Sequence, residues 1–355
     1  QLSRKEKWFY KNNQLECVSG FSYVGMYFSN TLSLYKMAEQ SAFKAKKVLL
    51  MLLKSALSLP YINYNTFFKI FDTKVTPIML YGAEIWGMLD LISIENIHTY
   101  AYKRFLHTSL YACNNAVMGD LGRFPIKIIA MKRCVKYWLR ILKLPDDRYV
   151  KLCYNMLMMY DNLGYENWVT YLRKNLYSNG FGYIWESQNI QNEDQFLSDY
   201  TRRLKDQYLQ SWNESCAQNK KLNKFYVHIK PTFGLEIYVK NLDIWKFKRC
   251  LSNFRCSSHQ LMIEKGRHIG LPVEDRICFH CKQSVENEYH FVIVCPLYSD
   301  LRNLYIPQNT LLLQIYTDFT CLFLIQMLKC YESWLCTCTM QTKSGIHMLC
   351  QEAMV

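Results

Sequence analysis

Three cysteines and one histidine lie close together near the end of the chain, in the stretch RICFHCKQSVENEYHFVIVC at 276–295. Cys278, Cys281, His290 and Cys295 have the spacing C-x2-C-x8-H-x4-C. A CxxC pair folds into a tight turn whose two thiolates can bind one ion, and four nitrogen and sulfur ligands complete a tetrahedron. Cobalt and iron bind similar ligands, but a closed set without a redox requirement favours zinc. We therefore predict a structural zinc site with no open position for a substrate.

The spacing between the last two ligands constrains the backbone. His290 and Cys295 are five residues apart, which is about 500° around an α-helix. They cannot share one face of a straight helix, so we expect the chain to bend between them. Glu286 and Glu288 lie near enough in the sequence to orient the His290 ring.

Three further residues near this motif are weaker ligand candidates. They are His280, between the two cysteines of the CxxC pair, and the upstream residues Cys256 and His259. None of the three has the spacing that the main motif shows.

The remainder of the sequence predicts a mainly α fold. Residues 15–30, rich in Val, Tyr and Phe around a Ser19–Gly20 turn signal, predict a β-hairpin. The polar run at 217–224 predicts a loop. Apolar residues at helical spacing predict helices at about 34–59, 65–88 (kinked or broken at Pro77), 92–107, 125–145, 147–177 and 193–213.

The helix predicted at 125–145 carries a stripe of cations. Lys132, Lys136 and Arg140 recur every four residues, and this segment contains no acidic residue. A charged stripe is often only the solvated side of an amphipathic helix. Because no acidic neighbour neutralises this stripe, we expect it to contact the phosphates of a nucleic acid.

The composition agrees with a polyanionic partner. The chain has 355 residues, and its 43 Lys and Arg against 29 Asp and Glu give a net charge of +14. Most of this excess lies in residues 1–150, which suggests RNA or DNA as the partner. No apolar run reaches the roughly 20 residues of a membrane helix, so we expect no membrane contact. The 15 cysteines without a secretory signal favour an intracellular, reducing compartment over a disulfide framework.

Several segments together resemble the carboxy-terminal region of LINE-type (non-LTR) retrotransposon reverse transcriptases. These segments are FSYVGMYFS at 21–29, VTPIMLYGAEIWG at 75–87, IENIHTYAYKRFLH, GDLGRFPIKIIAMKRCVKYWLRIL, and the long run from FRCSSHQ to VIVCPLY at 254–298. The resemblance covers about 15–305. It implies that Cys278, Cys281, His290 and Cys295 are metal ligands, and that Arg255 and Arg267 are basic positions that contact nucleic acid.

The resemblance also implies an architecture and a role. It implies the end of the polymerase palm at 1–33, a helical thumb at 34–145, a helical linker at 146–253, and a zinc knuckle of the CCHC type at 254–305. The implied role is target-primed reverse transcription, in which this region binds template RNA or target DNA in the cytoplasm and nucleus. Residues 306–355 depart from the family pattern, and we expect a shift of the reading frame near 310–315.

The catalytic residues of such a polymerase are missing. Nucleotide transfer requires carboxylates that hold two Mg²⁺ ions, and the family carries them in a Tyr-Ala-Asp-Asp element that would precede Gln1. Asp146 and Asp147 follow a proline and predict a turn and a helix cap. We therefore expect a fragment of a longer protein that lacks its polymerase and endonuclease regions, has no Mg²⁺ site and is inactive alone.

Two alternative functions remain open at this point. The chain can be a zinc-knuckle module that binds another protein, or a decayed relic of a retroelement.

Overall fold

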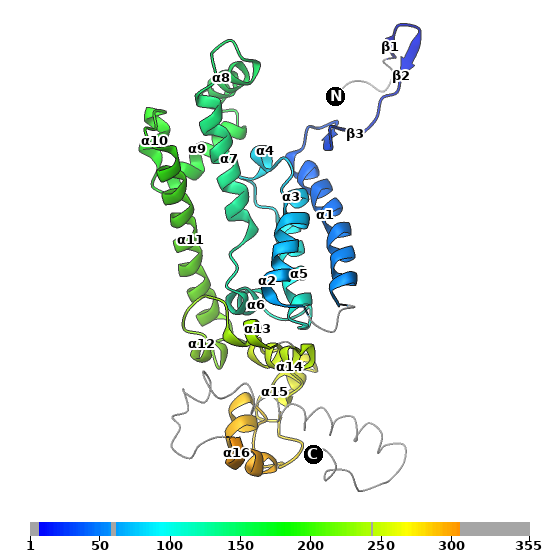
Figure 1. The fold of residues 1–355 in the computed structure, drawn as a ribbon, viewed down its shortest axis with the longest axis vertical. Coiled ribbons are helices and arrows are strands. Elements are labelled where there is room, and N and C mark those ends of the chain that lie inside the picture. Colours follow the sequence, from blue (N-terminus) through cyan, green and yellow to red (C-terminus); the bar gives the residue numbers. More distant parts are fainter. Residues whose placement is uncertain (1–6, 58–61, 243, 306–355) are drawn as a thin grey trace. The chain divides into compact units, whose positions relative to one another are not determined.

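The computed structural model describes residues 7–57, 62–242 and 244–305 (Figure 1). This part of the chain is mainly helical, with short antiparallel strands near its N-terminal end and a cluster of cysteine and histidine near its C-terminal end. The predicted fold class is therefore confirmed. Within the described residues, no helix combines the length and the apolar character needed to span a membrane. The frame shift predicted for 306–355 falls outside the described residues.

Two β-hairpins begin the described chain. Strands β1 (Trp8–Tyr10) and β2 (Asn13–Leu15) pair first, followed by β3 (Gly20–Tyr23) and β4 (Met26–Ser29). The second pair is the hairpin predicted at 15–30. Its turn lies at Val24 and Gly25, which have positive φ angles of 48° and 81°, as the two-residue hairpin turn requires. The prediction of a turn at Ser19–Gly20 was wrong, because Gly20 pairs with Ser29 inside the ladder.

The chain forms two compact units. The first contains residues up to Tyr102 together with Arg123–Trp212, and the second contains Lys103–Gly122 together with the residues from Asn213 onward. These units cut across the ranges predicted for thumb and linker, which were defined by a functional resemblance and stay a prediction.

The first unit contains the longest helices and several short ones. They are α1 (Leu34–Leu57), α2 (Tyr64–Ile70), α3 (Thr76–Met79), α4 (Ala83–Trp86), α5 (Ile92–Phe105, shared with the second unit), α7 (Ile126–Leu142), α8 (Tyr149–Asn162), α9 (Trp168–Ser178), α10 (Gly182–Ser187) and α11 (Glu193–Gln218, also shared). A π-helical turn at Phe71–Val75 joins α2 to α3, in which Pro77 is the second residue. The irregularity predicted at Pro77 is therefore a wider turn, consistent with the N–H that proline lacks.

The segment VTPIMLYGAEIWG places two glycines where side chains are excluded. Gly82 is the N-cap of α4 and has a positive φ of 76°. A Cβ atom on Gly87 would lie 2.7 Å from the carbonyl oxygen of Ala130. Helices α4 and α7 therefore approach each other at backbone distance, which only glycine permits here.

One apolar core joins α7 to the four helices that follow it. Its buried members are Ile128, Met131, Val135, Trp138, Leu139, Ile141, Tyr154, Val169, Leu172, Leu176, Trp185, Phe196, Leu197, Tyr200 and Leu204. The stacked indoles of Trp138 and Trp185, with ring centroids 5.6 Å apart, lie within it. The helix predicted at 147–177 is two helices, because Gly164 takes a positive φ of 86° and Asn167 caps a new helix.

The second unit is built from shorter helices. They are α6 (Asn114–Leu121), α12 (Tyr226–Ile229), α13 (Ile237–Asn241), α14 (Trp245–Arg255), α15 (Met262–His268), the π-helical turn His290–Val294, the 3-10 turn Pro296–Tyr298, and α16 (Ser299–Tyr305). A short β-bridge between Leu121 and Leu235 connects α6 to the C-terminal part of the chain. The sequence patterns did not predict α6 or α12 to α15.

Candidate metal centre

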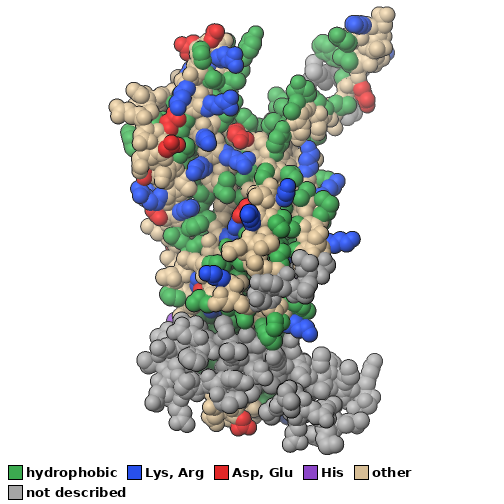
Figure 2. Space-filling view, in the orientation of Figure 1, with side chains coloured by type: hydrophobic (Ala, Val, Ile, Leu, Met, Phe, Trp, Pro, Cys, Tyr) green, Lys and Arg blue, Asp and Glu red, His purple; other side chains and the backbone are tan. Residues whose placement is uncertain are grey.

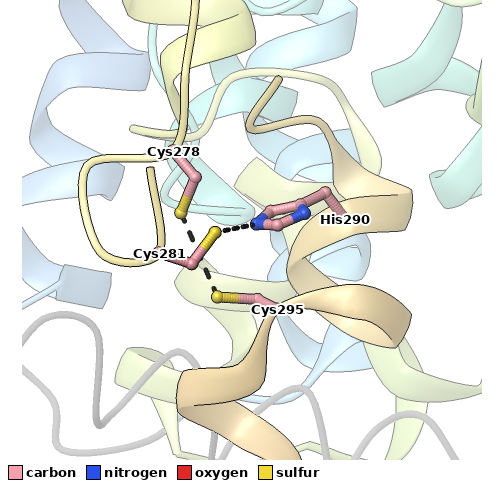
Figure 3. Close-up of side chains that lie close together, drawn as sticks. All are labelled: Cys278, Cys281, His290 and Cys295. Atoms are coloured by element: carbon pink, nitrogen blue, oxygen red, sulfur yellow. Dashed lines mark hydrogen bonds between the residues drawn. The ribbon is translucent and has the colours of Figure 1, made fainter. Parts of the chain in front are cut away.

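The two cysteines of the CxxC pair lie on a tight turn. The amide of Lys282 donates to the carbonyl oxygen of Cys278 at 2.9 Å, which closes the turn. The amide of Cys278 donates to the carbonyl oxygen of Ser284 at 2.8 Å. A β-bridge joins the neighbouring residues Ile277 and Val285. Both sulfur atoms point from this loop toward His290 and Cys295 (Figure 3).

The other two ligands lie on one widened helical turn. His290 begins the π-helical segment His290–Val294, and the amide of Cys295 donates to the carbonyl oxygen of His290 at 2.8 Å. This i→i+5 bond brings residue i+5 back over residue i. The bend that we predicted between the two ligands is therefore not needed: the turn widens, and both side chains project from it toward the CxxC loop (Figure 3).

The four side chains converge on one point. All of their ligand atoms lie within 4.8 Å of one another. The sulfur atoms of Cys278 and Cys295 are 4.0 Å apart, and the sulfur of Cys281 lies 3.3 Å from Nε2 of His290. Cys278, Cys295 and His290 are buried, and Cys281 is partly exposed. This cluster can hold one metal ion, as the spacing predicted.

Burial sets the protonation of the ligands before a metal binds. It raises the pKa of the Cys278 thiol to about 12 and also raises the pKa of Cys295. Burial alone would raise the pKa of Cys281 too, but an N–H from Gln283 and bonds to the other two thiols lower it overall. Burial lowers the pKa of His290, which favours the neutral imidazole that binds metals. A cation at this site must therefore displace protons from sulfur.

A hydroxyl group that the sequence did not single out orients the histidine. The Oγ atom of Ser284 lies 2.8 Å from Nδ1 of His290, which leaves Nε2 directed at the cysteines. The side chain of Asn287 accepts a hydrogen bond of 2.7 Å from the His290 amide. Only the folded loop shows these contacts, because serine and asparagine are common loop residues.

The two glutamates predicted to orient His290 have other partners, so that prediction was wrong. The carboxylate of Glu286 accepts a hydrogen bond of 2.7 Å from the amide of Met262 and one of 3.7 Å from the Cys278 thiol. Glu288 pairs with His259 at 3.0 Å.

Among the described residues, the group of side chains that could hold a metal ion is the four-residue cluster. None of the three weaker ligand candidates belongs to it. Cys256 is fully buried, and His259 is engaged by Glu288. His280 is half-buried on the CxxC turn, where burial lowers its pKa.

The predicted cationic stripe lies on the exposed side of α7. Lys132, Lys136 and Arg140 are all exposed, and none forms an ion pair within the described part of the chain. The other cations of this helix are engaged, since Lys127 pairs with Asp90 and Arg133 donates to the Leu80 carbonyl oxygen. Figure 2 shows several Lys and Arg side chains exposed in the part of the face where α7 and its neighbours lie.

The two arginines ahead of the knuckle differ from this stripe. Arg255 is only 6% exposed, and its guanidinium bonds the carboxylates of Asp120 and Glu236. Burial and these two carboxylate partners give Arg255 a structural role instead of the predicted contact with nucleic acid. Arg267 is more accessible, and its guanidinium pairs with Glu264 at 2.8 Å.

Asp146 and Asp147 are exposed in the turn between α7 and α8. The predicted turn is present. The prediction that these aspartates cap the next helix was wrong, because Arg148 is the N-cap of α8 and forms no side-chain cap bond.

Comparison with known proteins gives no relative for this chain: no family model, no curated protein and no solved structure matches it.

Proposed function

We propose that this chain is the nucleic-acid-binding C-terminal part of a LINE-type reverse transcriptase and that it binds template RNA or target DNA during target-primed reverse transcription. The proposal rests on the motif resemblance of 15–305 and on the exposed cations of α7. As part of that proposal, the chain itself carries no nucleotidyl-transfer centre.

The metal in this proposal is zinc with a structural role. Tetrahedral zinc with bonds of about 2.3 Å to sulfur and about 2.0 Å to nitrogen separates its ligand atoms by roughly 3.5–3.8 Å. The observed separations of 3.3 and 4.0 Å lie on either side of this range. Four protein ligands fill the coordination sphere, so the ion would cross-link the CxxC loop to the π-helical turn.

The observation that carries the nucleic-acid proposal is that Lys132, Lys136 and Arg140 are exposed and form no ion pair within the described residues. The opposite face of their helix is fixed in an apolar core through residues such as Val135 and Trp138. The cations are therefore held in a row on a rigid element, without acidic partners among the described residues. A phosphate backbone would supply the missing counter-charge and release its condensed counterions.

The salt dependence of binding tests this proposal. We expect the purified chain to bind single-stranded RNA and an RNA–DNA duplex, with affinity falling steeply as salt rises. Changing Lys132, Lys136 and Arg140 together to Gln should reduce the slope of log K against log salt by about 0.7–0.9 for each phosphate that the variant no longer neutralises.

A matched control removes the same charge from cations that already have acidic partners. Lys127, Lys174 and Arg202 pair with Asp90, Glu166 and Asp199. Their triple change to Gln should leave the slope nearly unchanged. Equal slopes for both triple variants would contradict a role for the stripe. If the chain instead binds another protein with an affinity that does not change with salt, the protein-interaction alternative is favoured.

A further inference from the structure

The second unit carries exposed cations and exposed aromatic rings on two segments that contact each other. One segment is the end of α5 with the loop that leads to α6, and the other is the first two turns of α14. The aromatic side chains are Tyr111, 86% exposed, and Trp245, 42% exposed. The cations are Arg104, Lys246 and Arg249, and all three are exposed. We call these five residues the loop–α14 surface.

Direct contacts hold the two segments together. The indole of Trp245 packs against the imidazole of His107, with ring centroids 5.6 Å apart. The side chain of Asn253 in α14 accepts a hydrogen bond of 3.2 Å from the amide of Ser109 in the loop. The hydroxyl oxygen of Ser109 in turn accepts one of 3.2 Å from the Tyr111 amide. The backbone under the surface is therefore already ordered, so a ligand loses little affinity to the ordering of the site.

Positive charge from both segments surrounds His107. Its pKa is lowered to about 4, first by burial and then by the charges of Lys248, Arg104 and Arg249. Arg104 lies on α5, whereas Lys248 and Arg249 lie on α14. The imidazole is neutral near pH 7, so it adds a flat uncharged ring beside Trp245. The cations of the two segments therefore form one group around this ring.

The exposed cations have no acidic partners within the part of the chain that the structure describes. Arg104, Lys246 and Arg249 form no ion pair there, and the first turn of α14 contains no acidic residue. Asp243 lies just before α14 in the sequence and outside the described residues. These three cations and Lys248, counted against this one carboxylate, still leave a net charge of +3.

The position of the lysines works against the stability of α14. The N-terminal end of a helix carries partial positive charge, so cations in its first turn are unfavourable. Lys246 and Lys248 lie in the first turn of α14, and Ile244 at its N-cap gives no side-chain cap bond. A local conflict of this kind is expected where residues serve binding instead of folding. A bound anion would relieve it.

We propose that the loop–α14 surface binds a single-stranded nucleic acid, with phosphates on its cations and bases stacked on Trp245 and Tyr111. Cations interleaved with exposed aromatic rings are the arrangement that such strands bind. A duplex offers the same phosphates, but its bases are already stacked on one another and do not reach the rings. This inference rests on the proposed function and adds the form of nucleic acid that the second unit binds.

Truncation of the aromatic side chains in the full chain tests the stacking. Tyr111→Ala and Trp245→Ala should each weaken the binding of a short single-stranded RNA or DNA by at least about 5-fold, as fluorescence anisotropy would measure. The slope of log K against log salt should not change, because stacking releases no counterions. Changing Arg104, Lys246 and Arg249 together to Gln should instead reduce that slope.

A matched residue and a matched ligand serve as controls. Tyr149 on α8 is 87% exposed and lies outside the surface, so Tyr149→Ala should bind like the original chain. An abasic strand of the same length carries the phosphates without the bases. Tyr111→Ala and Trp245→Ala should bind this strand as the original chain does. Tyr111 is almost fully exposed, so its truncation leaves the fold intact, and unchanged circular dichroism would show the same for Trp245→Ala.

The titration of His107 gives a local readout that does not depend on affinity. Phosphates bound next to the imidazole favour its charged form. The pKa of His107, measured by NMR, should therefore rise when the chain is saturated with a single strand. An unchanged pKa would overturn the inference.

The affinities separate this inference from the proposed function. A loss in the aromatic variants for RNA alone or for DNA alone would identify the strand, and a loss for both would show that the surface accepts either. Aromatic variants that keep full affinity for single strands, or lose as much for the abasic strand, would overturn the inference. The proposed function would then still stand on the variant of Lys132, Lys136 and Arg140. A chain that binds no nucleic acid would overturn both.

Discussion

The carboxylate of Asp120 accepts two hydrogen bonds, of 2.8 and 3.1 Å, from the guanidinium of Arg255, a residue far away in the chain. The hydroxyl groups of Tyr226 and Tyr238 donate to the same carboxylate at 3.1 and 2.8 Å. Asp120 is fully buried. These bonds join α6 to three other helices of the second unit, α12, α13 and α14.

Removing the Asp120 charge should destabilise the second unit strongly. In Asp120→Asn, the buried guanidinium of Arg255 keeps only Glu236 as a charged partner, and breaking a buried ion pair costs about 3–5 kcal/mol. We expect a loss of this order in the free energy of opening, measured by hydrogen exchange in α6 and α14. Asp199→Asn, which removes an exposed ion pair with Arg202, should change stability by less than about 1 kcal/mol. Similar effects of the two substitutions would contradict a structural role for the buried pair.

Loss of one ligand should abolish metal binding and loosen only the knuckle. We expect the chain to hold one zinc ion, and Cys281→Ser to hold none when metal content is measured after dialysis. In the same variant, amide exchange should accelerate in residues 270–300, while the core around α7 keeps its protection. Cys153→Ser, an exposed cysteine outside the cluster, should keep its zinc. Unfolding of the α7 core in Cys281→Ser would show that the knuckle is not an independent module.

Zinc affinity should fall as the pH is lowered. Burial raises the pKa values of Cys278 and Cys295, so both thiols are protonated at neutral pH and must lose protons when zinc binds. Lower pH favours the protonated, metal-free form, and higher pH favours the complex. The lowered pKa of His290 keeps this ligand neutral until the solution is more acidic than usual for histidine. Competition with a chromophoric chelator between pH 6 and 8 measures the zinc affinity, which should rise with pH because binding releases protons. An affinity independent of pH would contradict thiolate ligation.

Ser284 should influence the metal through the histidine ring. Ser284→Ala removes the hydrogen bond to Nδ1 of His290 while leaving all four ligands in place. Removing an orienting hydrogen bond of this kind typically lowers metal affinity by about 10–100-fold. Gln283→Ala, one residue earlier on the exposed side of the loop, serves as the control for the same affinity titration. Equal affinities in the two variants would assign the orientation of His290 to the backbone alone.

Much of the metal site was already determined by local sequence. Residue type and spacing identified Cys278, Cys281, His290 and Cys295, because thiolates and imidazoles at short separations along one chain are brought together by a turn. The cationic stripe of α7 was equally predictable, since charge periodicity along a helix is fixed by 3.6 residues per turn.

Only the tertiary structure decided the features that depend on distant or competing contacts. Arg255 looked like a free cation until folding placed Asp120 beside it. In α8, Tyr154 and Met158 on one side are as apolar as Met156 and Met159 on the other, so periodicity could not say which side is buried. Packing against α7 and α9 made that choice. The physical reason is that backbone geometry sets local periodicity, whereas burial depends on which surfaces meet after the chain has closed on itself.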